Sequence, residues 1–117
     1  FSTAGTAYTG NVLASEEEKM ETIIRYIPDD LLVAVRQKIE SLTAALFRGR
    51  YAGPFGIDMM VVARPDRDGF LLHPCVEINL RRTMGHVAIS LTRHLQRLPR
   101  VMTILSDNFT YKIQLSL

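Results

Sequence analysis

The hydrophobic pattern of this chain changes its period at Gly53, and that change restricts the folds open to it. Before Gly53, apolar residues recur at three- and four-residue spacings from Leu31 to Leu46, which is typical of an amphipathic helix. After Gly53, every second residue from Phe55 to Ala63 is apolar, as in a strand with one face buried. A chain that needs both kinds of element is neither a helical bundle nor an all-β sandwich.

The other segments extend this pattern in both directions. Ser15 with Glu18 has the form of a capping box and predicts a helix that runs until Pro28, and a second helix from Asp29 or Asp30 to Arg48. Turn residues at 65–69 separate the strand 55–63 from a strand over 70–81, which together predict a hairpin. Residues 1–14 are typical of a loop or an edge strand.

The last third of the chain predicts one more helix and one more hairpin. Thr83 can cap a helix that ends before Pro99, and its apolar stripe comprises Met84, Val87, Ala88, Leu91 and Leu95. Strands over 101–105 and 109–117 follow, and we expect the second to bury Phe109, Tyr111, Ile113, Leu115 and Leu117. The predicted fold is α+β: an antiparallel sheet built from hairpins and covered by about three helices, in a single domain over 1–117.

Composition excludes several classes of protein. The 117 residues carry a formal charge of only +2, which does not favour nucleic acid as a partner. No stretch approaches the roughly 18 apolar residues that a membrane-spanning helix needs, so no membrane partner is expected. Cys75 is the only cysteine, which excludes an internal disulfide and favours a reducing compartment such as the cytoplasm.

Polar residues gather at the end of the strand 70–81. Its even positions are apolar, whereas Glu77, Asn79 and Arg81 occupy odd positions and therefore project from one face. Carboxylate and amide oxygens are ligands that Mg²⁺ accepts, and a guanidinium can neutralise charge on a phosphoryl group. The row predicts a site for a divalent cation and a phosphate.

Asp58 is the candidate second carboxylate. It lies in an otherwise apolar strand, where an ionised side chain is costly unless it is paired or bound to a metal. One interpretation is a structural ion pair with Arg81 or Arg64, and the other is a metal ligand. The metal-ligand interpretation requires Asp58 to share a face with Glu77, which happens only if the residue numbers of each cross-strand pair add up to an odd number. A loop with an even number of residues or a bulge would produce this register, and Pro74 is the expected place for a bulge.

About 30 contiguous residues carry a resemblance to a known family. The segment Y-A-G-P-F-G-I-D-M-M-V-V, a turn, and then H-P-C-V-E-I-N-L-R-R-T-M-G-H resemble the carboxyl-terminal catalytic lobe of the ATP-grasp superfamily. In that family a G-x-D strand precedes a strand bearing E-x-N-x-R, and a glycine-containing turn leads into a helix. The resemblance implies ATP-dependent ligation of a carboxylate to an amine or thiol through an acyl-phosphate.

The resemblance also implies roles for individual residues. Asp58, Glu77 and Asn79 would bind Mg²⁺ or Mn²⁺, and Arg81 would contact the transferred phosphate as the catalytic residue. Asn11, in a glycine-containing segment that loosely resembles the stretch before this lobe, is a candidate for binding the ATP cofactor; a solvent-exposed loop is the alternative. His73 shares the face of Glu77 and could orient a carboxylate, or it is an ordinary strand histidine.

The sequence departs from the family in one respect. The lysines and the glycine-rich phosphate loop that the preceding lobe supplies are absent from these 117 residues, which begin with Phe1. We therefore expect a terminal lobe of a larger ligase, inactive alone, whose partners are the missing upstream nucleotide-binding lobe and a small-molecule or peptide carboxylate substrate. Self-association is a further expected property of a lobe separated from its neighbours.

Two other functions fit the same residues. The first is a non-catalytic α+β interaction module, in which the charged row is a salt-bridged surface and a hairpin edge docks a partner. The second is a free-standing metal-dependent phosphate-binding protein. Binding of Mg²⁺ or Mn²⁺ that Glu77→Gln abolishes favours the ligase lobe, and indifference to metal favours the module.

Overall fold

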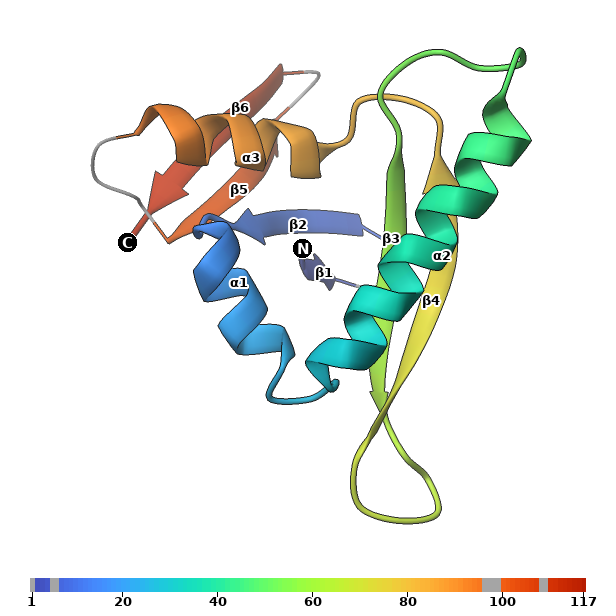
Figure 1. Ribbon diagram of the computed structural model, residues 1–117. Coiled ribbons are helices and arrows are strands. Elements are labelled where there is room, and N and C mark those ends of the chain that lie inside the picture. Colours follow the sequence, from blue (N-terminus) through green and yellow to red (C-terminus); the bar gives the residue numbers. More distant parts are fainter. Residues whose placement is uncertain (1, 5–6, 96–99, 108–109) are drawn as a thin grey trace. The chain divides into compact units, whose positions relative to one another are not determined.

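A computed structural model describes residues 2–4, 7–95, 100–107 and 110–117 (Figure 1). Within these ranges the structure is α+β, as the sequence predicts, with three helices and two antiparallel sheets. The described strands form two separate sheets, one of four strands and one of two. The chain divides into two compact units, one comprising residues 1–16 and 82–117 and the other residues 17–81. No helix in the described ranges is long and apolar enough to cross a bilayer.

The first unit contains the four-stranded sheet, in which strands from both ends of the chain pair. Its order is β1-β2-β5-β6, and its strands are β1 (Ser2–Ala4), β2 (Ala7–Val12), β5 (Val101–Asp107) and β6 (Thr110–Ser116). Gly10 of β2 faces Thr103 of β5, and a Cβ at Gly10 would collide with the carbonyl oxygen of Met102. The close approach of β2 and β5 therefore requires glycine at this position.

Helix α3 (Met84–His94) covers the core of this unit. Leu13, Ala88 and Met102 are buried there, and Met84, Val87, Leu91 and Leu95 pack against them. Thr83 and His86 form the capping box at the start of α3: the threonine side chain accepts from the backbone N–H of residue 86, and the backbone N–H of Thr83 donates to Nδ1 of His86 at 3.1 Å. The predicted apolar stripe of this helix is confirmed.

The predicted burial of β6 is wrong, although the predicted face is right. Leu115 lies opposite Met102, and Ile113 lies opposite Ile104, so the apolar residues of β6 share the face that carries Met102. The side chains on this face are nevertheless exposed: Leu115 by 39%, Ile113 by 51% and Tyr111 by 76%. Leu117, just after the strand, is 97% exposed. β6 is the edge strand of the sheet, and α3 packs on the centre. Phe109 lies outside the described residues.

The second unit comprises two helices and a hairpin. α1 (Glu16–Ile23) ends before the predicted stop at Pro28, and a turn leads into α2 (Asp29–Phe47), whose bounds match the prediction. Ile27 and Leu32 are buried where the two helices join. β3 (Gly56–Ala63) and β4 (Phe70–Asn79) form the two-stranded sheet.

Aromatic pairs hold both ends of α2 against this hairpin. The rings of Tyr26 and Phe70 pack edge to face with centroids 4.9 Å apart, before α2 and at the start of β4. The rings of Phe47 and Phe55 do the same at 5.1 Å, at the end of α2 and just before β3. Such pairs contribute about 0.5–1.5 kcal/mol each beyond their burial. α2 consequently runs beside β3 and β4 (Figure 1).

Candidate functional site

The register of the β3–β4 hairpin decides which side chains share a face. Ala63 pairs with Phe70 across a loop of residues 64–69, which the bond from the Arg64 N–H to the Gly69 carbonyl closes at 2.9 Å. Gly69 has a φ of 111°, a left-handed conformation that favours glycine. The loop therefore has an even number of residues, and the paired positions sum to an odd number as the metal-ligand interpretation of Asp58 requires.

A bulge then shifts the register further along the strands. Met60 pairs with His73, whereas Asp58 pairs with Glu77, so Met59 alone faces residues 74–76. Pro74 lies inside this interval, where its missing N–H breaks no ladder bond. The predicted position of the bulge is confirmed.

The register places Asp58, Glu77 and Asn79 on one face of the hairpin. Asp58 is the Cα partner of Glu77, and Gly56, which has no side chain, is the partner of Asn79. Directly opposed residues of an antiparallel pair have Cβ atoms about 4.5–5.5 Å apart. Asp58 is half-buried and Glu77 is exposed. Since like charges directly opposite each other repel, a cation between the two carboxylates would be stabilising.

Asn79 links Asp58 to Arg81. Its Nδ2 donates to Oδ2 of Asp58 at 3.5 Å, and its Oδ1 accepts from Nη2 of Arg81 at 3.0 Å. The backbone N–H of Arg81 also donates to the carbonyl of Asn79 at 2.9 Å. The amide thus presents its donor to a carboxylate and its acceptor to a guanidinium, as electrostatics favours.

This orientation has a consequence for metal binding. A cation on the two carboxylates would be coordinated by the amide oxygen of Asn79, which here faces Arg81. The amide must therefore rotate to become a ligand, which releases Nη2 of Arg81 from it. Two carboxylates and one amide suit Mg²⁺, which keeps several waters when bound. Within the described part of the chain, no group of three or more His, Cys, Asp or Glu side chains is placed to hold a metal.

The alternative ion pair between Asp58 and Arg64 does not form. Nε of Arg64 lies 3.6 Å from Oδ1 of Asp66, in the loop of the hairpin. His73 shares the face of Glu77, as predicted, because its partner Met60 and the Glu77 partner Asp58 lie two residues apart on β3.

Asn11 belongs to the other unit. It lies in β2 opposite Met102, and its Oδ1 accepts a hydrogen bond from the hydroxyl of Tyr8. Burial raises the pKa of the Tyr8 phenol, because removal from water disfavours the phenolate. The amide oxygen of Asn11 is therefore engaged within its own sheet.

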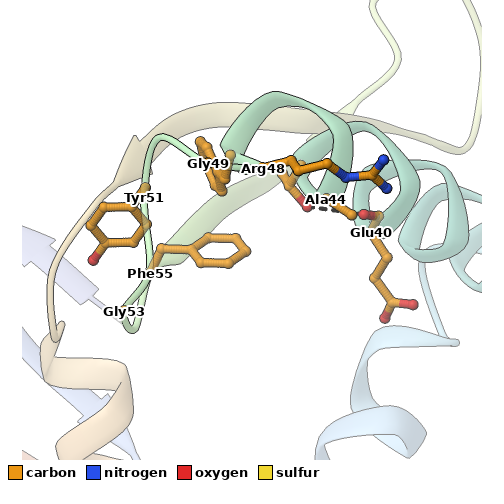
Figure 2. Close-up of a pocket in the computed structure, with 9 residues that line it drawn as sticks. Glu40, Ala44, Arg48, Gly49, Tyr51, Gly53 and Phe55 are labelled. Atoms are coloured by element: carbon orange, nitrogen blue, oxygen red, sulfur yellow. Dashed lines mark hydrogen bonds between the residues drawn. The ribbon is translucent and has the colours of Figure 1, made fainter.

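A pocket of about 550 Å³ lies elsewhere in the second unit and was not predicted from the sequence. It opens beside the end of α2, between that helix and the chain that leads into β3 (Figure 2). Its aromatic residues Phe47, Tyr51 and Phe55 recur every four positions, and this spacing was the sequence signal available for it.

Comparison of the chain with protein-family models, curated proteins and solved structures finds no match.

Proposed function

We propose that this chain is the metal- and phosphate-binding lobe of an ATP-dependent carboxylate–amine or carboxylate–thiol ligase of the ATP-grasp type. The observation that carries the proposal is the pairing of Asp58 with Glu77, with Asn79 at the end of the same strand. The predicted strand over 70–81 ends at Asn79, and Arg81 lies just beyond it, hydrogen-bonded to the Asn79 side chain. The order of the G-x-D and E-x-N-x-R motifs in the sequence supports the proposal, and so does the common face of Asp58 and Glu77. These two observations are independent, because the motifs do not determine the register of the hairpin.

In this proposal, Asp58, Glu77 and Asn79 bind the metal, and Arg81 binds the phosphate. A divalent ion bound by Asp58, Glu77 and Asn79 would neutralise charge on the ATP phosphates during phosphoryl transfer to a substrate carboxylate. Arg81, released from the Asn79 amide when that amide turns toward the ion, would donate to the transferred phosphoryl oxygens. The lobe thus contributes positioning and charge neutralisation, and forms no covalent bond to the substrate.

The proposal assigns the remaining parts of the cycle to other segments. A nucleotide-binding lobe upstream would enclose ATP, and that lobe would choose the acid and the amine or thiol acceptor. The chain alone would not turn over, and a cytoplasmic location fits its free Cys75. Robust ATP consumption by residues 1–117 alone would contradict this assignment.

Metal binding by the row can be tested on the 117-residue chain. Mn²⁺ added to the chain should broaden the backbone amide NMR signals around Asp58 and Glu77, a readout that detects even millimolar binding. Glu77→Gln should remove the local broadening. Asp68→Asn, which removes an exposed carboxylate from the loop of the same hairpin, should leave it intact. Broadening that spares both strands, or that persists unchanged in Glu77→Gln, refutes the site.

One observation favours a second function, the non-catalytic interaction module. The hairpin exposes many large apolar side chains, among them Met60, Phe70, Leu71, Val76 and Leu80, which is unusual for a surface in contact with water alone. A docking hairpin would present such a surface, and so would a lobe with a neighbouring domain. Indifference of the chain to Mn²⁺ would support the module, whereas self-association is expected of both the module and an isolated lobe.

A further inference from the structure

The pocket beside the end of α2 has a volume within the range of small-ligand sites. Its residues all belong to the unit 17–81, and its volume of about 550 Å³ compares with roughly 300–1,000 Å³ for pockets that bind ligands. One wall is aromatic and the other carries two charged side chains from α2 and the residue after it (Figure 2). None of the proposed metal or phosphate ligands lines it.

The aromatic wall is held in place by contacts of its own. Phe47 packs edge to face against Phe55 at 5.1 Å and against Tyr51 at 5.8 Å. The Tyr51 hydroxyl donates to the carbonyl of Pro54 at 2.6 Å. The Tyr51 ring lies over Gly53, where a Cβ would come within 2.9 Å of the Tyr51 hydroxyl. The rings therefore form an apolar surface that exists before any ligand arrives.

The opposite wall presents one negative and one positive charge. Glu40 of α2 and Arg48, the residue after it, line the side of the pocket opposite Tyr51 and Phe55, and the Arg48 guanidinium points away from the two rings (Figure 2). They lie eight residues apart, and the helical rise places their Cα atoms about 12 Å apart along the axis. Both are exposed, and within the described ranges neither forms an ion pair. The hydroxyl of Thr43, between them, donates to the backbone of α2 and offers no hydrogen to a ligand.

We propose that this pocket binds a short peptide with free ends. The peptide amino group would lie at Glu40, its carboxylate would receive the bidentate guanidinium of Arg48, and an apolar side chain would rest on the Phe47–Phe55 wall. A tripeptide spans about 10 Å from end to end, which is close to the spacing of the Glu40 and Arg48 Cα atoms along the helix axis. The proposal stands on the pocket alone and requires neither ATP nor a metal.

The probe for the test is the tripeptide Ala-Leu-Ala, added to the full chain at low salt without nucleotide or metal. We expect millimolar binding, seen as saturable shifts of the backbone amide signals of residues 40–55. Acetylating the amino end, or amidating the carboxyl end, should each weaken binding about threefold to fivefold, as loss of one exposed ion pair does. Gly-Gly-Gly should bind more weakly still, because it lacks the side chain that covers the rings.

Variants then assign each end of the peptide to one residue. Glu40→Gln should weaken binding of the free peptide, and acetylation of the peptide should then cause no further loss of affinity. Arg48→Gln should likewise weaken binding and remove the effect of amidation. Arg36→Gln, which removes an exposed charge of α2 outside the pocket, should behave as the unmodified chain does. The doubly capped peptide needs no protein variant, so the test does not depend on whether a mutant folds.

The outcomes separate the proposal from its rivals. Equal affinity for free and doubly capped peptide refutes recognition of the ends. A cap effect at only one end, matched by only one of the two variants, shows a site for a simple amine or a simple acid, and refutes the peptide. Shifts that map outside residues 40–55 refute the pocket. Any of these results leaves the proposed metal site untouched, because Mn²⁺ broadening at Asp58 and Glu77 is measured separately.

Discussion

Asp58 lies directly opposite Glu77 across the β3–β4 ladder, two residues along each strand from the pair formed by Gly56 and Asn79 on the same face. Two carboxylates are thus held side by side by a backbone register. Natural sheets avoid such pairs because like charges directly opposite are destabilising. The arrangement makes sense where a cation relieves the repulsion, and this reasoning leads to the first prediction.

Glu77→Gln should stabilise the metal-free chain. Removing one of two opposed carboxylates should raise the free energy of unfolding by about 0.2–0.5 kcal/mol, a small effect because Glu77 is exposed to solvent. Urea denaturation at low salt measures it, and the gain should vanish near 1 M salt, where the screening length is about 3 Å. Asp68→Asn, with no carboxylate opposite it in the ladder, should show no such gain. A salt-independent gain for Glu77→Gln would contradict the electrostatic reason.

Asn79→Ala should destabilise the hairpin. The substitution removes the donor to Asp58 and the acceptor from Arg81, and net losses of this kind are about 0.5–1.5 kcal/mol per hydrogen bond. We expect the low end for the 3.5 Å contact. Urea denaturation measures the loss, and Gln114→Ala on the exposed edge strand β6 is the matched control. Equal stability of the two variants would show that the Asp58–Asn79–Arg81 chain contributes nothing.

Gly10→Ala should destabilise the four-stranded sheet by about 1–3 kcal/mol, the usual cost of inserting atoms where there is no room. The added Cβ would collide with the Met102 carbonyl, and backbone cannot move aside as a side chain can. Thermal unfolding followed by circular dichroism measures the effect. Gly85→Ala in α3 is the control, because its Cβ would meet only the Thr83 hydroxyl at 3.4 Å and alanine favours the helix by roughly 1 kcal/mol. Opposite signs are expected for the two substitutions.

Stability should fall as the pH rises above about 10, the unfolded-state pKa of tyrosine. Burial raises the pKa of Tyr8 in the folded chain, so the folded state holds its proton longer than the unfolded state does. The contribution is therefore complete below the unfolded pKa and is lost as pH rises through the folded one. Tyr8→Phe should flatten this part of the curve, and Tyr111→Phe at an exposed position should not. A profile unchanged by Tyr8→Phe would contradict the prediction.

Local structure was largely predictable from the sequence. The bounds of α2 follow from Pro28 before it and Gly49 after it, which adopts a left-handed φ of 70°. The stripe on α3 was predictable because helical spacing assigns residues to a face without reference to the rest of the chain. The exposure of Ile113 and Tyr111 was not predictable, because a strand pattern defines a face but not whether a helix reaches far enough to cover it.

For the candidate site, the sequence by itself determined that Glu77 and Asn79 share a face, since side-chain alternation is a property of any strand. The alternation did not place Arg81, because β4 ends at Asn79 and Arg81 lies in the turn that follows. Only the tertiary structure decided that Asp58 joins them. That outcome depends on a loop spanning residues 64–69 and on a bulge at residues 74–76, and a slip of one residue would have turned Asp58 to the opposite face. Likewise, the Glu40–Arg48 pocket exists because Phe47 packs on Phe55 across a chain reversal, and the four-residue spacing of the aromatic residues does not by itself specify that contact.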